Sequence, residues 1–349
     1  MSKASVTIYD VAKRAGVGIG TVSRVLNQSR GLAPATRERV LRVIDELNFR
    51  PHAYAQGLAR RKAFAIAAIV PFFTGYFYVE LLKGIQQAVS KHKYDLILYS
   101  ADDLKKTGLY IRRALLERRV DGLLLISLRL PETFSEEFHR RRLPLVLVDS
   151  SHPEYDSITV NNRDGAYRAV QHLIAMGHRR IAIVNGHLDS VPAQERLAGY
   201  QQAISEAGLE MPEAFVLSSD EFGSDVMTLN DGFNKESGYL AMRRLLAAGQ
   251  DRATAVFMAS DIQAMGAIKA VREAGMRVPE DLAMVGFDDI ELSEYLGLTT
   301  VKQPMFKMGE QAAERLLTLI EHPESEHQHV RIETELIVRE SSGQMPMAS

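Results

Sequence analysis

The sequence contains no cysteine, which excludes a disulfide framework and thiol chemistry. No window approaches the roughly 18 uncharged apolar residues that a membrane-spanning helix needs. The opening stretch MSKASVTIYD lacks the apolar core of a secretory signal peptide. We therefore expect a cytoplasmic protein with no membrane partner.

Patterns typical of catalysis are also missing. The ten histidines are scattered along the chain, and no Gly-x-Ser-x-Gly nucleophile turn occurs. The adjacent acids Asp288 and Asp289 have no further acidic partner at a spacing that suggests hydrolysis. We predict no enzyme, no metal site and no cofactor.

Positive charge is concentrated at the start of the chain. Residues 1–62 carry twelve Lys and Arg against four Asp and Glu, whereas the whole chain has a net charge of −2. The first 62 residues therefore have a net charge of +8 and the remainder −10. A small basic module joined to a larger acidic body indicates contact with a polyanion at one end. Chance clustering on a solvated surface is the alternative.

Three short helices are predicted in this basic module. Thr7 followed by Asp10 is typical of a capping box that begins a helix, and Gly16 suits the left-handed end of that helix. A second helix is expected over residues 18–27, with one apolar and one polar face. Pro34 suits the first turn of a third helix. The apolar residues of the third helix recur at helical spacing: Val40, Val43, Ile44 and Leu47.

The glycines of GVGIG, residues 16–20, allow two interpretations. A dinucleotide- or phosphate-binding loop needs a preceding strand or a following Lys-Ser/Thr pair, and here a capped helix precedes and no such pair follows. The other interpretation is a helix-turn-helix, in which Gly16 permits the turn and the second helix presents its polar face to a major groove. The pattern favours the helix-turn-helix over both the cofactor loop and a helical hairpin without a ligand.

Residues 6–60 resemble the headpiece of the lactose/galactose repressor (LacI/GalR) family of bacterial transcription regulators. The segments TIYDVAKRAGVGIGTVSRVLN and TRERVLRVIDELNFRPHAYAQGLAR carry the resemblance, because helix, turn, third helix and hinge appear in order. The resemblance implies that Ile19, Gly20 and Arg24 read bases. Gly18 stands where a capping Ser is usual, and Gly20 where a longer polar side chain is frequent, so direct readout at one base position should be weak.

Further DNA contacts are expected beside these three. We expect Ser23 to contact base edges or phosphates, and Thr21 and Asn27 to contact oxygens of the DNA backbone. In the resembling family the hinge becomes helical only on the operator and inserts a leucine into the minor groove, which corresponds here to Leu58 with Ala55 nearby. An exposed linker without this role is the alternative. The complete predicted set is Thr7, Tyr9, Ile19, Gly20, Thr21, Ser23, Arg24, Asn27, Arg30, Ala55 and Leu58.

From residue 64 onward, apolar runs alternate with amphipathic helices. The strand candidates are FAIAAIVP, YDLILYS, DGLLLIS and LPLVLVD in the first half and RIAIVNG, FVLSSD, TAVFMAS and LAMVGFDD in the second. Buried runs separated by helices predict parallel sheets that are covered on both faces. We interpret DSITVNNRDG as a break between two similar halves. LTTVKQP, the helix after it and HVRIETELIVRE are expected to cross back between the halves.

The predicted fold is an N-terminal three-helix helix-turn-helix headpiece and an α/β body of two doubly wound parallel-sheet lobes. Such a body is that of periplasmic sugar-binding proteins, which the resembling family shares. We expect the headpiece at residues 1–50, a hinge at 51–63 and an effector-binding and dimerisation domain at 64–349. The expected lobes are residues 64–161 with 293–322, and residues 162–292 with 323–341.

A ligand cleft is expected at the carboxyl ends of the strands. Carboxylates and an arginine suit sugar hydroxyls, and aromatic rings suit an apolar sugar face. The resemblance implies effector contacts at five positions: Asp149, Arg196, Asp288, Phe77 and Tyr78. The complete candidate set is Phe72, Phe77, Tyr78, Asp149, Arg196, Phe222, Phe233, Ser260, Asp261 and Asp288.

Alternatives remain open for several of these residues. Asp288 also suits a helix cap, and Arg196 also suits a structural ion pair between the lobes. Any aromatic side chain after the first strand also suits the core. An aromatic residue of the second lobe is expected to close the cleft, and Phe222 and Phe233 are both candidates.

The sequence thus predicts a homodimeric, ligand-responsive transcription regulator, most often a repressor in the resembling family. Its partners are double-stranded operator DNA and a small molecule, with a sugar ahead of a purine or nucleoside. The same cleft also suits a co-repressor or a protein partner. A sugar-binding receptor without a DNA role is opposed by the basic headpiece, and an oxidoreductase by the helical context of GVGIG. The end SSGQMPMAS has no leucine heptad, which favours a dimer over a tetramer.

Overall fold

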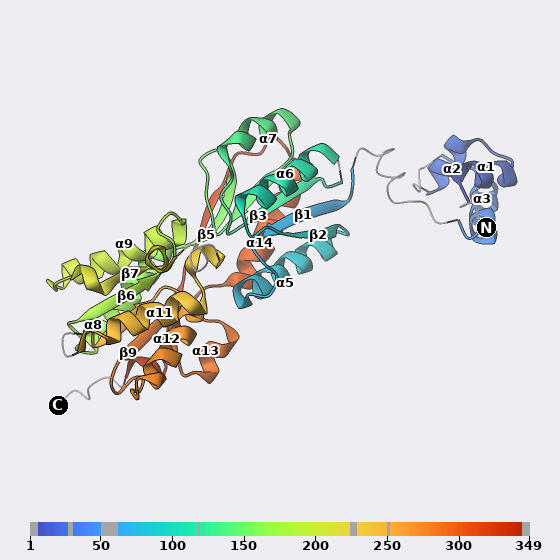
Figure 1. The fold of residues 1–349 in the computed structure, drawn as a ribbon. Coiled ribbons are helices and arrows are strands. Elements are labelled where there is room, and N and C mark those ends of the chain that lie inside the picture. Colours follow the sequence, from blue (N-terminus) through green and yellow to red (C-terminus); the bar gives the residue numbers. More distant parts are fainter. Residues whose placement is uncertain are drawn as a thin grey trace. The chain divides into compact units, whose positions relative to one another are not determined.

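The computed structural model describes residues 6–26, 31–49, 62–117, 119–223, 229–249 and 252–343, without the side chains of Leu104 and Leu229. The chain divides into two compact units, residues 1–63 and 64–349 (Figure 1). The first unit holds the headpiece and the second holds the body. The predicted helix-turn-helix headpiece and α/β body of two parallel-sheet lobes are confirmed.

The headpiece contains three helices, α1 (Ile8–Ala15), α2 (Ile19–Leu26) and α3 (Pro34–Glu46). The predicted capping box is present before α1: the Asp10 carboxylate accepts from the Thr7 backbone N–H at 2.8 Å and from its hydroxyl at 2.7 Å. Gly16 ends α1 with φ 63° and ψ 39°, a left-handed conformation that glycine adopts without the Cβ strain of other residues. This turn sets the direction of α2.

A small apolar core holds these helices together. Each helix contributes one face, as the periodicity predicts. The buried core residues are Val11, Ala12, Ala15, Val22, Val25, Val40 and Val43. Because no residue of the second unit belongs to this cluster, the headpiece has its own core.

The body contains two six-stranded sheets with the same order of connections (Figure 1). The first sheet runs β11-β5-β4-β3-β1-β2 and the second β12-β10-β9-β8-β6-β7. All pairings within them are parallel except that of β10 with β12. The first sheet comprises β1 (Ala65–Val70), β2 (Asp95–Ser100), β3 (Gly122–Ile126), β4 (Leu145–Val148), β5 (Asp156–Val160) and β11 (His329–Ile332). The second comprises β6 (Ile181–Asn185), β7 (Val216–Ser218), β8 (Ala255–Met258), β9 (Ala283–Asp288), β10 (Thr299–Lys302) and β12 (Glu335–Ile337).

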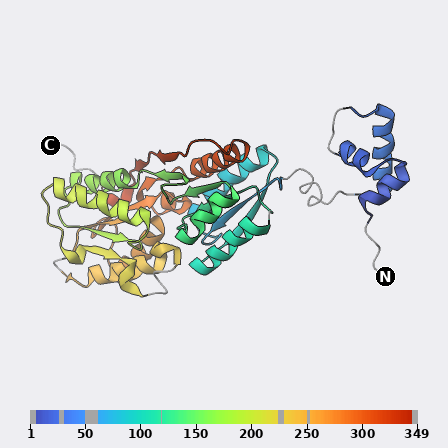
Figure 2. The same ribbon diagram turned by 90° about the horizontal axis from the view of Figure 1, so that it is seen from above.

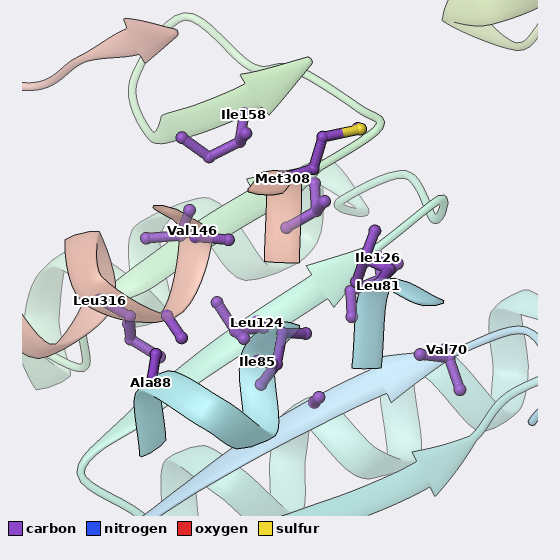
Figure 3. Close-up of a cluster of buried hydrophobic side chains, with 14 of the residues drawn as sticks. Val70, Leu81, Ile85, Ala88, Leu124, Ile126, Val146, Ile158, Met308 and Leu316 are labelled. Carbon is purple, nitrogen blue, oxygen red and sulfur yellow. The ribbon is translucent and has the colours of Figure 1, made fainter. Parts of the chain in front are cut away.

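Helices cover both faces of each sheet (Figure 2). In the first lobe, α5 (Tyr76–Lys91) and α14 (Met305–Glu321) cover one face, and α6 (Leu104–Glu117) and α7 (Ser135–Arg141) lie on the other. Side chains from β1, β3, β4 and β5 meet those of α5 and α14 in a continuous apolar cluster (Figure 3). Because both faces are covered, the central strands β1, β3 and β4 are apolar and buried along their whole length, as expected for parallel sheets.

The second lobe repeats this arrangement. Alternate residues of β6 enter two separate clusters, Ala182 and Val184 on one face and Ile181 and Ile183 on the other. The covering helices are α11 (Lys235–Leu246) with α12 (Asp261–Glu273), and α8 (Asn162–Ala175) with α9 (Val191–Glu206); a short helix α13 (Glu291–Tyr295) follows β9. No helix in the described part of the chain has the length and apolar character needed to cross a membrane.

The stretch DSITVNNRDG contains a strand that the sequence pattern did not predict, since Asp156–Val160 forms β5 of the first sheet and Asn162 then begins α8 of the second lobe. The polar residues of this stretch hid the strand from the hydrophobic pattern. Asp156 is only 1% exposed, and its carboxylate accepts from Arg315 Nε at 2.5 Å and from the Gln328 backbone N–H at 3.1 Å. These partners compensate for burial of the charge, so a strand that begins with aspartate is stable in the interior.

The predicted lobe boundaries near the C-terminus also need correction. β10, at Thr299–Lys302, pairs with β9 in the second sheet, although residues 293–322 were assigned to lobe one. β11, at His329–Ile332, pairs with β5 in the first sheet, although residues 323–341 were assigned to lobe two. α14 of the first lobe and β12, at Glu335–Ile337 in the second sheet, lie where expected. Strand propensity does not reveal which of two similar sheets a crossing segment joins, because pairing depends on long-range packing.

Paired helices of the body approach each other at glycines. An added Cβ on Gly84 of α5 would lie 2.0 Å from the Phe306 carbonyl oxygen of α14, and one on Gly309 would lie 2.0 Å from that of Leu81. Backbone atoms cannot rotate away as a side chain does, so this contact tolerates only glycine. The other helix pairs have equivalent contacts at Gly199, Gly238 and Gly266.

Gly84→Ala should therefore destabilise the body by about 1–3 kcal/mol through overpacking. The matched control is Gly108→Ala in α6, where the nearest atom to an added Cβ is a Phe134 ring carbon at 3.4 Å. That change should stabilise the protein by about 0.5–1 kcal/mol, because alanine favours helix. Urea unfolding measures both. Equal effects of the two substitutions would contradict the close helix contact.

Candidate functional site

The first candidate site is the polar face of α2 in the headpiece. Val22 and Val25 are buried, whereas Ile19 is 41% exposed and Gly20 and Arg24 are also exposed. An added Cβ on Gly20 would have no atom within 4 Å, so the position is open. The face of α2 expected to meet DNA is therefore the face that the headpiece leaves in solvent.

The other predicted DNA contacts are distributed around this face. Tyr9 on α1 is 67% exposed, and Thr21 and Ser23 on α2 are partly exposed. Thr7 is exposed and caps α1. The remaining four predicted residues lie outside the described part of the chain: Asn27, Arg30, Ala55 and Leu58.

The second candidate site is a cleft in the body at the carboxyl ends of strands from both sheets. This is the edge at which doubly wound sheets bind ligands. Seven predicted effector residues line it, together with polar residues that the sequence analysis did not include. The lining residues are Phe77, Tyr78, Ser127, Leu128, Arg129, Asp149, Ser150, Ser190, Val191, Pro192, Arg196, Asn230, Asp231, Phe233, Ser260, Asp288 and Gln303.

Arg196 of α9 is the buried cation of this cleft, with 3% exposure. Its Nε donates to Asn162 Oδ1 at 2.9 Å and its Nη1 to the Ala259 carbonyl at 2.5 Å. The guanidinium lies 3.8 Å from the centroid of the Phe287 ring. Burial lowers the pKa of Arg196, while the nearby carboxylates of Asp288 and Asp149 raise it. The side chain is held rigidly, with its charge directed at the cleft.

Asp149 faces the cleft from the first lobe, directly after β4. Its backbone has φ 56°, a left-handed conformation that aspartate tolerates better than most residues. Oδ2 accepts from Ser127 Oγ at 2.8 Å, but Oδ1 is out of solvent contact and has no hydrogen-bond partner among the described residues. Burial raises the pKa of this carboxyl to about 6, and Arg196 opposes the rise. Asp149 Oδ1 is thus a buried acceptor to which no described residue donates a hydrogen bond.

Asp288 ends β9 on the opposite side of the cleft and is 6% exposed. Its Oδ1 accepts from Gln303 Nε2 at 2.6 Å and lies 4.0 Å from Arg196 Nη1. Burial raises the pKa of Asp288, and Arg196 opposes that rise. Gln303 Oε1 has no hydrogen-bond partner among the described residues. The side chain does not cap the following helix, since Ile290 occupies the N-cap position of α13.

The structure corrects the prediction for Asp261, which does not line the cleft. This side chain is fully buried. Its oxygens accept from Ser293 Oγ at 2.6 Å, Thr300 Oγ1 at 2.7 Å and the Ile290 backbone N–H at 3.2 Å. These bonds tie α12 to α13 and β10, so Asp261 has a structural role. Its neighbour Ser260 does line the cleft, and its hydroxyl also accepts from the Gln263 N–H that begins α12.

Two aromatic candidates also lie away from the cleft wall. Phe72 packs edge-on against Tyr78, with ring centroids 5.0 Å apart, and supports it from behind. Phe222 packs against the core of the second lobe. Phe233 is the candidate that lines the cleft, with the Arg196 guanidinium 5.3 Å from its ring centroid. Sequence could not separate the two phenylalanines, because both lie in the same stretch between β7 and α11.

Several cleft residues were missed by the sequence analysis. Ser127 directly follows β3 and Gln303 directly follows β10, so the strand-end rule that identified Asp149 applies to both. Arg129 lies two residues further along the same loop as Ser127. Asn230 and Asp231 lie in an irregular segment without a strand signal, and only the tertiary structure brings them to the cleft.

The chemistry of this cleft is that of binding. Carboxylate, amide and hydroxyl oxygens converge with one buried guanidinium and aromatic rings from both lobes. Among the described residues, no group of three or more His, Asp or Glu side chains is arranged to hold a metal ion. Such a set of groups recognises a compact polar ligand with an apolar face.

Known proteins resemble this chain along its whole length. Residues 7–52 match the family described as Bacterial regulatory proteins, lacI family, and residues 170–342 match the Periplasmic binding protein-like domain. Catabolite control protein A of Priestia megaterium is 35% identical over 90% of this chain and 92% of its own length. The HTH-type transcriptional repressor PurR of Vibrio vulnificus is 34% identical over 96% of this chain and 98% of its own length. Both are named as regulators rather than as enzymes.

Two solved structures share the fold. The complex of the transcriptional regulator CelR with cellobiose is 34% identical, covers 96% of this chain and 99% of its own, and superposes with a TM-score of 0.71. The lac repressor dimer bound to operator and the anti-inducer ONPF is 28% identical, covers 98% of this chain and 100% of its own, and has a TM-score of 0.82. The similarity therefore extends over headpiece and body together.

Proposed function

This chain belongs to the lacI family of bacterial regulatory proteins, and on that premise we propose that it is a transcriptional repressor controlled by a small molecule. The headpiece binds operator DNA, and the ligand binds between the two lobes of the body. The observation that carries the proposal is the combination of a basic headpiece, whose helix α2 exposes one face, with a separate polar cleft in the body. A receptor that only binds a ligand does not need a DNA-binding headpiece, and a protein that binds DNA constitutively does not need a ligand cleft.

The proposed DNA contacts follow from the exposure of α2. Ile19, Gly20 and Arg24 are directed at base edges, because they occupy the open face of the helix. Thr7, Tyr9, Thr21 and Ser23 surround this face and suit phosphate contacts. For the four predicted residues outside the described part of the chain, the proposed DNA contacts rest on the family resemblance: Asn27, Arg30, Ala55 and Leu58. Of these, Leu58 enters the minor groove.

The proposed assembly is a homodimer. A helix-turn-helix reads one half-site, and a dimer reads two half-sites on a pseudo-palindromic operator. The similar lac repressor structure, which is a dimer on operator DNA, supports this arrangement. In the dimer, a change in the angle between lobes is transmitted to the paired hinges and from there to DNA affinity.

The proposed effector is a neutral molecule rich in hydroxyl groups, such as a sugar. Asp149 Oδ1 and Gln303 Oε1 both require hydrogen-bond donors, and a sugar supplies several. An ionised phosphate or carboxylate group supplies no hydrogen-bond donor. It is also repelled by the three carboxylates of Asp149, Asp231 and Asp288, which outnumber the two arginines that line the cleft. The cellobiose in the similar CelR structure supports a sugar. A purine or nucleoside is the second candidate, because Phe77 and Phe233 also suit stacking on a base.

A panel of unphosphorylated sugars, the corresponding sugar phosphates and purine bases tests this proposal. We expect an unphosphorylated sugar to raise the melting temperature, and its phosphate to raise it less, because the phosphate brings negative charge to the carboxylates. The same ligand should change the affinity for duplex DNA about fivefold to 150-fold, and DNA should change ligand affinity by the same factor. If only a purine binds, the proposed effector is a purine and not a sugar. A ligand that binds the cleft without changing the affinity for DNA would refute allosteric control.

A further inference from the structure

Two side chains of the first lobe contact the second lobe across the cleft. Tyr78 of α5 donates its hydroxyl hydrogen to Asn230 Oδ1 of the second lobe at 2.6 Å. Arg129, in the loop after β3, has its Nη1 3.5 Å from the Asp189 carboxylate, which follows β6. Burial raises the pKa of the Asp231 carboxyl, and Arg129 is the strongest influence that lowers it. The lobes are therefore joined by direct contacts between protein groups.

One of these contacts, that of Tyr78, is made to a short segment of the second lobe, residues 230–233, which we call the strap. Asn230, Asp231 and Gly232 have φ of 56°, 47° and 76°, three consecutive left-handed conformations. Such a backbone is costly for residues other than glycine and persists only where surrounding structure holds it. The strap therefore depends on its anchors.

Those anchors all belong to the second lobe. The Asp231 carbonyl accepts from the His187 backbone N–H at 2.6 Å. The Gly232 carbonyl accepts from Ser237 Oγ at 2.5 Å and from Gln263 Nε2 at 3.2 Å. These bonds attach the strap to the loop after β6 and to helices α11 and α12.

Close packing fixes the strap further. An added Cβ on Gly232 would lie 1.8 Å from Ser219 Oγ, and one on Gly186 would lie 2.5 Å from Phe233 Cζ. The strap is therefore pressed onto its own lobe and moves with it as one body. Its bond to Tyr78 is consequently a bond between lobes, and any opening of the cleft breaks that bond.

We propose that two contacts, that of Tyr78 with the strap and that of Arg129 with Asp189, together form a clamp that keeps the two lobes closed over the cleft in the absence of effector. This inference rests on the proposed function insofar as the cleft is the effector site. The effector then enters only when the clamp opens, so the clamp sets the equilibrium between open and closed lobes on which the effector acts. Asn230 and Asp231 are positioning residues for that equilibrium.

The two attachments differ in strength. Tyr78 is 2% exposed, and its bond to Asn230 is shielded from solvent. The side chains of Arg129 and Asp189 are 50% and 67% exposed, so water and salt weaken their attraction. Loss of the hydroxyl should therefore shift the closed-to-open ratio roughly twofold to tenfold. Loss of the arginine charge should shift it less, and only at low salt.

Single-molecule energy transfer between the lobes tests the clamp without any ligand. The chain has no cysteine, so dyes are attached uniquely through Glu136→Cys in α7 of the first lobe and Gln201→Cys in α9 of the second, both exposed. We expect a predominantly closed population in the labelled parent protein. Tyr78→Phe should populate the open state, and Arg129→Gln should do so at about 20 mM but not at about 500 mM salt, where the screening length is far shorter.

Matched controls are available within the first lobe. Tyr155→Phe removes a hydroxyl that donates to the Ser135 carbonyl at 2.8 Å, and Arg140→Gln removes an exposed charge away from the cleft. Neither should change the ratio. A parent protein that is open without ligand, a Tyr78→Phe protein as closed as its parent, or controls that open it equally would each overturn the clamp.

Exposed Arg129 can be replaced without risk to folding, so the test holds even if Tyr78→Phe is unstable. The measurement uses neither DNA nor effector. If the lobes prove not to be clamped, the proposed DNA binding is unaffected. If the chain proves not to bind DNA, the lobes can still be found closed by these contacts.

Discussion

Removal of residues 1–62 should reduce affinity for duplex DNA by about 10³-fold or more. These residues carry a net charge of +8, whereas the remainder carries −10 and is repelled by phosphates. If the dimer neutralises about 6–10 phosphates, the full chain should lose about 10³–10⁵ in affinity between roughly 50 and 200 mM salt. The truncated chain should show no such salt dependence. Fluorescence anisotropy with a labelled duplex selected by the full chain measures both quantities.

The truncated body should remain folded, because its apolar clusters contain no headpiece residue. Its melting curve, and its stabilisation by any effector of the full chain, provide the control. In the full chain, Arg24→Ala should cost about 1–3 kcal/mol of specific binding. Arg39→Ala removes the same charge from an exposed position on α3 and should cost less. Unchanged DNA affinity after truncation would refute the proposed function.

Arg196→Ala should destabilise the body by about 3–5 kcal/mol, the range for breaking a buried ion pair from one side. The substitution leaves the Asn162 and Ala259 acceptors without their donor and removes the cation beside Asp288. The stacking of the guanidinium on Phe287 is lost as well. Urea unfolding measures the change. Arg244→Ala, which breaks the exposed pair with Glu221, is the control and should cost no more than about 1 kcal/mol.

The penalty of Arg196→Ala should depend on pH. Burial already raises the pKa of Asp288, and Arg196 holds that rise back, so removal of the arginine raises the pKa further. A carboxyl with a raised folded-state pKa favours folding at low pH, and this contribution is lost as pH rises through that pKa. The wild-type pKa of Asp288 is raised to about 8, so both proteins lose this contribution in parallel below that pH, and the stability gap between wild type and variant should widen as pH rises above about 8. A constant gap would show that the charge of Asp288 is not involved.

Local patterns were sufficient for the headpiece. The capping pair Thr7 and Asp10, the left-handed Gly16 and the spacing of valines all act within a few residues of one another, so the sequence predicts them directly. The same reasoning identified most strands of the body, because a run buried on both faces is apolar throughout. It failed at β5, where Asp156 is compensated by Arg315 from a helix far along the chain.

The cleft was predictable only in part. Asp149 and Asp288 follow apolar strands, and the rule that ligands bind at the ends of parallel strands identified them. The same rule wrongly included Asp261, whose carboxylate accepts hydrogen bonds from three other residues of the second lobe. Whether a residue at a strand end faces the cleft or the interior depends on its partners across the fold.

The sequence by itself determined that the chain has a basic helix-turn-helix and a doubly wound α/β body, because caps, turns and burial patterns act over short distances. Only the tertiary structure decided which sheet β10 and β11 join, which phenylalanine lines the cleft, and that residues 230–233 reach Tyr78 of the other lobe. Those outcomes depend on contacts between segments more than a hundred residues apart along the chain, and no local pattern records such contacts.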